Sequence, residues 1–326
     1  MRLSPTAVLK YETCPHQYFL EEVLRIRPVH KAANLVFGGV VHRVVEETFR
    51  HTLLGQPFDA VVLFQQSWQA AREAGGIGYS ATQSPESLTE TGAALVGQFA
   101  REWREWGWWP ALDGQNQPLI ERKFHVELTA GLVYVGKCDL LALNGDGILA
   151  CLDLKTPSSA TDPDWLATAD QLTGYQLLLD AHAGALEIPP IQRLGLIELI
   201  KRKVTKTGKG PEVCPPVTVA RRPASVLDAY RQKLVWIAED IDRRMNELRL
   251  AARDFVTDPG NQSLQVGEAA TSLSEILKKT RLELAPEQQD MIDGVTERLA
   301  TYRSGIERIS TLINRRAEMI VALPPL

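Results

Sequence analysis

Two aspartates and a lysine are set into apolar stretches between residues 135 and 156, where the sequence reads VGKCDLLALNGDGILACLDLKT. The apolar runs predict two strands, and the Asn-Gly-Asp-Gly segment at 144–147 predicts the hairpin turn that joins them. Because side chains alternate along a strand, Asp153 and Lys155 share one face, and the hairpin brings Asp139 alongside them. A carboxylate in a buried strand is costly unless it is paired or bound to a metal. Two carboxylates and an ammonium at one spot suit divalent-metal chemistry on a phosphodiester.

The simpler interpretation of the same residues is an ordinary ion pair. Asp153 and Lys155 could form that pair at the edge of a sheet, with Asp139 a polar residue at the end of a strand. An isolated Asp-x-Lys is a common tripeptide, so it does not decide between the two interpretations by itself. Polar pairs elsewhere in the chain favour the chemical interpretation.

Two amphipathic segments each carry a polar pair at helical spacing. Apolar residues recur at intervals of three and four through residues 37–53, FGGVVHRVVEETFRHTL, which predicts a helix with His42 and Glu46 on one face. The segment DQLTGYQLLLDAH is also apolar and helical in pattern, and it holds Gln171 and Tyr175 four residues apart. Each pair alone is a weak indication, because such pairs are frequent on helices without catalytic roles.

Taken in order, these residues resemble the motifs of the RecB-type branch of the PD-(D/E)XK nuclease superfamily. The opening segment, LSPTAVLKYETCPHQYFLEEVL, is similar to that branch's N-terminal signature of a Ser, then Cys-Pro, then an aromatic residue before a helix. No Pro-Asp precedes the Asp-x-Lys core, and Asp139 stands in for that acid, as is usual in this branch. The resemblance covers residues 3–205. The residues that carry it are Gly38, His42, Glu46, Asp139, Asp153, Lys155, Gln171 and Tyr175, with Ser4, Cys14, Pro15 and Tyr18 in the signature.

The resemblance implies a site for one or two Mg²⁺ or Mn²⁺ ions. By this resemblance the metal ligands are His42, Asp139 and Asp153, and the carbonyl of Leu154 adds another. Hard oxygen ligands with one imidazole suit both ions, which keep several waters in their coordination shells. In such a site the metal lowers the pKa of a water and neutralises charge on the phosphate.

The resemblance also implies roles for the residues around the metal. Lys155 is expected to orient the attacking water or to stabilise charge on the phosphate. Gln171 and Tyr175 are expected to position the lysine and the nucleic-acid backbone. Glu46 is expected to hold His42 or a metal-bound water, and Glu121, on the strand before Asp139, is a further nearby acid.

The cysteines argue against an iron–sulfur cluster, which many relatives in this branch carry. The chain has four cysteines, and Cys138 and Cys151 lie beside the strand aspartates, where we expect small buried side chains. Only Cys14 and Cys214 occupy regions where relatives hold a cluster, and two ligands do not hold a cubane that needs four. We therefore expect no Fe–S cluster. Scattered cysteines without paired spacing fit a reducing compartment, here the cytoplasm.

Length and composition indicate an intracellular globular enzyme. The chain has 326 residues, of which 44% are hydrophobic and 23% charged, enough to bury a large core. No apolar run approaches the roughly 18 residues that a membrane span requires, and the N-terminus lacks the apolar core of a signal peptide. The net charge of −4 is unusual for a protein that binds nucleic acid by charge alone. We therefore expect the acidic residues to gather at a metal site and local basic patches to bind the nucleic-acid backbone.

The clearest basic patch follows the apolar run LGLIELI and contains Lys201, Arg202, Lys203 and Lys206. We expect a strand that leaves the core and ends in a flexible loop that contacts DNA. The alternative is an edge strand protected by charge, which is a common device against unwanted sheet pairing.

A group of tryptophans also has two interpretations. Their rings could stack on unpaired bases, or they could fill the core of a helical subdomain, which is the more frequent use of such residues. We expect the group to end a helix that begins near Glu90. Its members are Trp103, Trp106, Trp108 and Trp109.

The expected fold is α/β, with a restriction-endonuclease-like mixed central sheet flanked by helices. We expect a nuclease domain over residues 1–256, a helical insertion in it at 58–108, and a C-terminal helical extension at 264–326. The extension has an apolar stripe from Met291 to Ile313 that suits a short coiled coil or a packed helix. The expected elements are helices in 3–30, 34–54, 165–184 and 224–254, and strands near 118–129, 131–143, 147–156 and 192–202.

The expected function is metal-dependent exonuclease action on single- or double-stranded DNA ends, in recombination, repair or phage DNA processing. The chain has no Walker A motif, so a helicase or recombinase activity would have to come from a partner protein. The alternatives are an endonuclease on the same fold, an RNA-directed nuclease, and a catalytically silent nucleic-acid-binding subunit. The intact set of His42, Asp139, Asp153 and Lys155 argues against the silent subunit.

Overall fold

The computed structural model describes residues 1–25, 28–202 and 210–257, with a few single residues beyond them. Several predictions therefore concern residues outside the described part. These are Lys203 and Lys206 of the basic patch and the apolar stripe from Met291 to Ile313.

The chain divides into two units, Met1–Ile237 and Ala238–Leu326. The boundary falls within α8 (Ala224–Thr257), a long helix that the sequence predicts at 224–254. The first unit contains the central sheet and its flanking helices, and the description below concerns that unit. The division at residues 256 and 264 stays a prediction.

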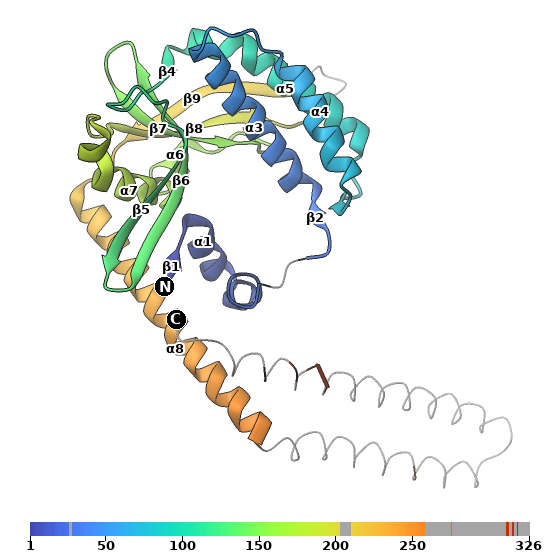
Figure 1. The fold of residues 1–326 in the computed structure, drawn as a ribbon, viewed down its shortest axis with the longest axis vertical. Coiled ribbons are helices and arrows are strands. Elements are labelled where there is room, and N and C mark those ends of the chain that lie inside the picture. Colours follow the sequence, from blue (N-terminus) through green and yellow to red (C-terminus); the bar gives the residue numbers. More distant parts are fainter. Residues whose placement is uncertain are drawn as a thin grey trace, which may run out of the picture. The chain divides into compact units, whose positions relative to one another are not determined.

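A mixed sheet of seven described strands forms the centre of the first unit (Figure 1). The order is β1, β6, β7, β8 and β9, while β4 and β5 also pair with β6. β7 and β8 run parallel, whereas β6 is antiparallel to β5 and β7, and β9 is antiparallel to β8. This sheet confirms the predicted α/β fold class and is consistent with a restriction-endonuclease-like fold. The strands are β1 (Arg2–Leu3), β4 (Trp108–Pro110), β5 (Ile120–Thr129), β6 (Leu132–Asn144), β7 (Leu149–Lys155), β8 (Arg193–Ile200) and β9 (Glu212–Ala220).

Helices lie on both sides of the sheet: α3, α4 and α5 cover one face, and α6 and α7 lie against the other (Figure 1). A small second sheet pairs β2 (Lys31–Ala32) with β3 (Ile77–Gly78). None of the helices in the described ranges is both long enough and apolar enough to cross a membrane. The helices are α1 (Pro5–Thr13), α2 (Pro15–Tyr18), the π-helical turn Phe19–Val23, α3 (Ala33–Leu53), α4 (Ala60–Glu73), α5 (Pro85–Glu102), the 3₁₀ turn Trp103–Trp106, α6 (Pro163–Leu166) and α7 (Asp170–Leu186).

The core between α3–α5 and the sheet is rich in aromatic rings. Trp103 is fully buried and meets Phe49 of α3 edge to face, with ring centroids 4.8 Å apart. Trp103 thus belongs to the core, as one of the two interpretations predicted, and Trp106 and Trp108 pack against it partly buried, whereas Trp109 is 43% exposed. Trp108 and Trp109 form β4 and pair with β6, so the prediction that they end a helix was wrong.

β9 is a strand that the sequence analysis missed. It contains Pro215 and Pro216, and proline cannot donate a hydrogen bond to a neighbouring strand. The two prolines fall where the β8–β9 register shifts, between Leu196 and Glu198, and β9 is the terminal strand of the sheet order. A bulge on an outer strand tolerates them, whereas the sequence alone makes this segment resemble a loop. Lys201 and Arg202 thus lie in the connection between β8 and β9.

Candidate active site

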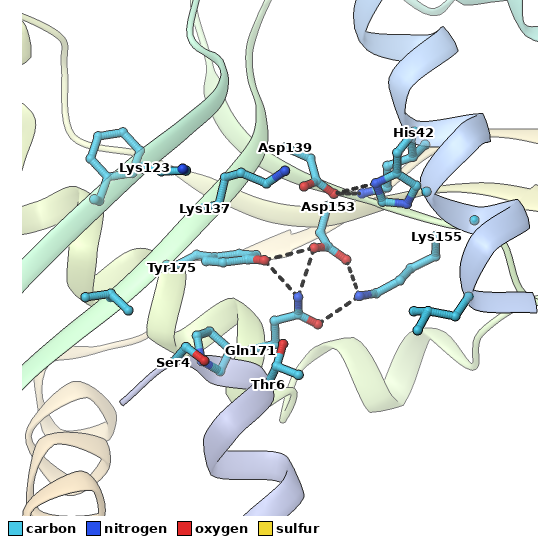
Figure 2. A pocket seen from close by; sticks show the side chains of 18 of the residues that line it. Ser4, Thr6, His42, Lys123, Lys137, Asp139, Asp153, Lys155, Gln171 and Tyr175 are labelled. Atoms are coloured by element: carbon cyan, nitrogen blue, oxygen red, sulfur yellow. Dashed lines mark hydrogen bonds and ion pairs between the residues drawn. The ribbon is translucent and has the colours of Figure 1, made fainter. Parts of the chain in front are cut away.

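A cleft of about 800 Å³ opens where β6 and β7 cease to pair (Figure 2). The last paired residues of these strands are Leu140 and Leu152, which are the sequence neighbours of Asp139 and Asp153. Beyond that point, the backbone N–H of Leu154 donates a hydrogen bond to Oδ2 of Asp139, 2.8 Å away. A side chain therefore replaces the strand ladder at the mouth of the cleft, and both carboxylates reach the same space.

Asp153 lies at the centre of a closed hydrogen-bond network (Figure 2). Its Oδ1 accepts hydrogen bonds from the Gln171 amide at 3.0 Å and the Tyr175 hydroxyl at 3.1 Å. The Gln171 amide also donates to the Tyr175 oxygen at 2.8 Å, and its carbonyl oxygen accepts from Nζ of Lys155 at 2.9 Å. Nζ of Lys155 lies 2.7 Å from Oδ2 of Asp153. The four residues that the sequence placed on one strand and one helix thus meet.

Helix α7 reaches this network through a tight contact with β6. A Cβ added at Gly174 would lie 2.1 Å from the hydroxyl of Tyr134, and one added at Gly136 would lie 2.6 Å from Leu178. Such distances leave no room for a side chain at either glycine. The close approach sets the depth at which Gln171 and Tyr175 enter the cleft.

Helix α3 brings His42 to the other side of the cleft. Nδ1 of His42 lies 3.7 Å from Oδ2 of Asp139, and the ring also bonds to the backbone of Leu154. A Cβ at Gly38 would lie 3.1 Å from Oγ1 of Thr156, so this glycine lets the helix approach the end of β7. At Gly39 there is open space, and that residue lines the cleft. Of these two glycines, Gly38 is therefore the one that permits a close approach.

Burial shifts the ionisation of the site residues in opposite directions. Desolvation, followed by the negative charge of Asp153, raises the pKa of Asp139 to about 7. Desolvation lowers the pKa of His42 to about 4, although Asp153 works in the opposite direction. Burial and the charge of Asp153 raise the pKa of the Tyr175 hydroxyl far above its ordinary value, so it remains a donor. Without a cation, the site therefore resists a second negative charge at Asp139.

Glu121 joins His42 and Asp139 in a cluster of metal-ligand type. Each of the three offers a ligand atom, and these atoms all lie within 4.8 Å of one another. Glu121 has a φ of 53°, a left-handed conformation that is rare for a residue other than glycine. It falls between the paired residues Ile120 and Arg122, so the irregular backbone places its carboxylate at the site. Asp153 is not in this cluster.

The donor set fits a hard divalent cation. Ligands of Mg²⁺ at about 2.1 Å lie within about 4 Å of one another, so the cluster of His42, Glu121 and Asp139 needs only a small contraction. Oδ2 of Asp153 is buried and accepts no hydrogen bond of good geometry within the described structure. Its neighbour is the ammonium of Lys155, which shows that a cation is favoured at this oxygen.

Two lysines in the cleft escaped the sequence analysis. Lys137 lies two residues before Asp139 on β6 and forms an ion pair with Glu121. Burial lowers the pKa of Lys137, but the hydrogen bond to Glu121 and the negative charges of Glu121, Asp139 and Glu46 together outweigh it, so the net shift is upward. Lys123 of β5 also lines the cleft, on the same side as Lys137 (Figure 2). The period-two spacing of Lys137 and Asp139, and of Glu121 and Lys123, is the signal that could have identified both lysines.

Other predicted residues lie beside the cleft or away from it. Glu46 borders the cluster of His42, Glu121 and Asp139, but its carboxylate pairs with Arg50 at 2.8 Å. Lys201 and Arg202 do not line the cleft and lie at a second pocket.

The N-terminal signature has structural roles that also shape the cleft. Ser4 caps α1 by accepting a hydrogen bond from Ala7, and it lines the cleft (Figure 2). Cys14 caps α2, and Tyr18 is buried against Tyr11 with ring centroids 5.4 Å apart. The signature thus holds the first two helices together.

The fold and this site together define the class of a nuclease that works with divalent metal ions. The family model of the PD-(D/E)XK nuclease superfamily matches residues 2–303, and the chain belongs to that superfamily. Membership implies a metal-dependent nuclease that hydrolyses the phosphodiester bonds of nucleic acid. A search of curated proteins finds no match to the chain.

Proposed function

We propose that this protein is a metal-dependent DNA exonuclease of the RecB type. The observation that supports it best is the closed network of Asp153, Lys155, Gln171 and Tyr175 at the cleft. A simple ion pair at a sheet edge would need neither the amide nor the phenol. A network that fixes an ammonium beside a cluster of metal ligands is what phosphodiester hydrolysis requires.

The ligands for the metal are His42, Asp139 and Asp153, with Glu121 as a fourth and the carbonyl of Leu154 as a further candidate. A Mg²⁺ or Mn²⁺ ion bound there would lower the pKa of a water and offset charge on the phosphate. Asp139 suits this role because the cost of its ionisation is offset when a cation is near.

Lys155 is the residue that would act on the phosphate or the water. Its ammonium has three donors; it donates a hydrogen bond to Gln171 and forms an ion pair with Oδ2 of Asp153. The ammonium can therefore still donate to the phosphate, to stabilise the developing charge, or to the attacking water, to orient it. Gln171 and Tyr175 would position Lys155 and Asp153. Glu46, one turn along α3 from His42, would hold His42 or a metal-bound water.

DNA ends are the proposed substrate, with a role in recombination, repair or phage DNA processing beside a helicase or recombinase. We also propose that the protein holds no Fe–S cluster, because Cys138 and Cys151 are buried in the sheet beside the aspartates. The cytoplasm is the proposed compartment, since free thiols persist where glutathione keeps them reduced.

The test compares end-labelled linear DNA, covalently closed circular DNA and RNA in Mg²⁺, Mn²⁺ and EDTA. An exonuclease degrades linear DNA and leaves closed circles intact. Cutting of circles would identify an endonuclease, and loss of RNA instead would identify an RNA-directed nuclease. DNA binding without cleavage under either metal would identify a silent binding subunit and contradict the proposal.

A further inference from the structure

A second pocket, of about 850 Å³, adjoins the cleft. Asn34 lines both spaces, and Pro157 of the second pocket follows Lys155 by only two residues. Two residues of extended chain span about 7 Å, so the pocket begins close to the proposed catalytic lysine. The helical insertion provides one wall with Ser80, Thr82, Gln83, Ser87, Leu88 and Thr91. The opposite wall consists of Pro157, Ser158, Ser159, Lys201 and Arg202.

The lining of this pocket has the chemistry of an anion site. It contains hydroxyl groups, side-chain amides and two cations, and none of its described lining residues is an aspartate or glutamate. This composition is unusual in a chain whose net charge is −4. Hydroxyl, amide and ammonium donors are the groups that bind the sugar–phosphate backbone of nucleic acid.

Lys201 is the available cation in the pocket. It is partly buried, and its backbone N–H donates to the carbonyl of Pro157 at 2.8 Å. Its ammonium forms no ion pair with any residue in the described ranges, and burial lowers its pKa. Arg202, in contrast, pairs with Glu212 at 2.6 Å. A partly buried ammonium without a carboxylate is stabilised when an anion binds beside it.

Hydrogen bonds to β8 hold the wall opposite the insertion in place. Glu198 of β8 is buried and accepts hydrogen bonds from the backbone N–H of Thr161, at 3.1 Å to each oxygen. The hydroxyl of Thr161 donates to the same carboxylate. These bonds fix the loop that contains Ser158 and Ser159, so the pocket exists before a ligand arrives.

We propose that this second pocket binds a backbone phosphate of the substrate strand, next to the phosphodiester held in the cleft. Lys201 supplies the charge, and the hydroxyls of Ser158 and Ser159 supply further donors. The inference rests on the proposed nuclease function and adds the side on which the strand leaves the cleft, between the helical insertion and the 157–159 loop.

The test measures binding of a fluorescein-labelled single-stranded oligodeoxynucleotide to the full-length protein in EDTA over a range of salt concentrations. Lys201→Gln should weaken binding and reduce the magnitude of the slope of log K against log[salt] by about 0.7, which corresponds to the loss of one phosphate contact on a single strand. Arg193→Gln is the matched control, because Arg193 is exposed at the other end of β8 and lines neither space. It should bind as the wild type does.

A second variant guards against an effect of Lys201→Gln on folding. Ser158→Asp places a carboxylate at an exposed position of the pocket wall and should also weaken binding, with an unchanged Tm. The inference is wrong if Lys201→Gln and Ser158→Asp both bind as Arg193→Gln does while wild-type protein binds and cleaves DNA. If the wild type neither binds nor cleaves DNA, the proposed function fails and this inference fails with it.

Discussion

At the residue scale, Asp139 links the ionisation of the site to stability. Its pKa rises from the usual 3.8 to about 7 because it is buried and faces Asp153. The folded protein therefore binds more protons than the unfolded chain between these values. Stability falls as pH rises through this window, and the cost is absent below about pH 4 and complete above about pH 7.

Asp139→Asn should remove this cost in the metal-free protein. The difference in free energy of unfolding between the variant and wild type should grow by at least about 1 kcal/mol from pH 5 to pH 8 in favour of the variant. This corresponds to a growth of about 2 °C in the difference between their Tm values. Thermal melts in EDTA at both pH values measure it. Asp228→Asn, at an exposed position of α8, is the control and should give the same small difference at both. An advantage that does not change with pH would contradict the raised pKa.

Glu121 makes a further prediction at this scale, because its left-handed backbone aims a carboxylate at His42 and Asp139. Glu121→Gln should weaken Mn²⁺ binding about 10-fold or more, as measured by calorimetric titration. Glu127→Gln, on the same strand at an exposed position, should leave it unchanged. Equal affinities in the two variants would exclude Glu121 from the metal site.

At the scale of elements, the position of α7 depends on glycine. Gly174 lies against the Tyr134 hydroxyl, which in turn lies 3.1 Å from the hydroxyl of Tyr230. Any side chain at Gly174 must move β6 or α7, and α7 holds Gln171 and Tyr175 in the cleft. Gly184 on the same helix faces open space.

Gly174→Ala should therefore destabilise the protein by about 1–3 kcal/mol through overpacking, with loss of cleavage. Gly184→Ala is the matched control and should stabilise it by up to about 1 kcal/mol through helix propensity. Urea midpoints at constant m-value measure both. If the two alanines have the same effect, the contact with Tyr134 does not set the position of α7.

The sequence sufficed for the elements with strong periodicity. The helix around His42, predicted at 34–54, runs from Ala33 to Leu53, and the strands around Asp139 and Asp153 lie within two residues of their predicted ends. Strand and helix periods predict that Asp153 and Lys155 share one face and that Gln171 and Tyr175 share another. That the two pairs act together was implied by the resemblance to the RecB-type branch, and spacing alone does not predict it.

Other features depend on tertiary structure and left weak traces in the sequence. β9 was missed because two prolines break the strand pattern, and only its bulge on an outer strand accommodates them. The carboxylate of Glu121 points to the site because Glu121 itself has a left-handed backbone conformation inside a strand, which no residue propensity predicts.

At the scale of the whole molecule, a metal ion bound at the proposed site would stabilise the folded state. The cluster of metal ligands joins α3, β5 and β6, which come together only in the fold. Mn²⁺ at about 100 times its Kd should raise stability by about 2.7 kcal/mol, and EDTA should reverse the effect. The increase in Tm should be larger at pH 8 than at pH 5, because protons compete for Asp139. The Asp139→Asn variant should show little of this increase in Tm. A wild-type Tm that does not change when Mn²⁺ is added would contradict the proposed site.

The most direct test of the central claim is the initial rate of phosphodiester cleavage in linear DNA with Mn²⁺, for wild type, Asp153→Ala, Lys155→Ala and the control Asp228→Ala. We predict that the rate of cleavage falls by a factor of about 10² to 10³ or more in each of the two site variants, while the control keeps the wild-type rate. EDTA should abolish cleavage by wild type and by the control. Cleavage that persists in EDTA, or that survives both Asp153→Ala and Lys155→Ala, would show that the reaction takes place elsewhere or by other means.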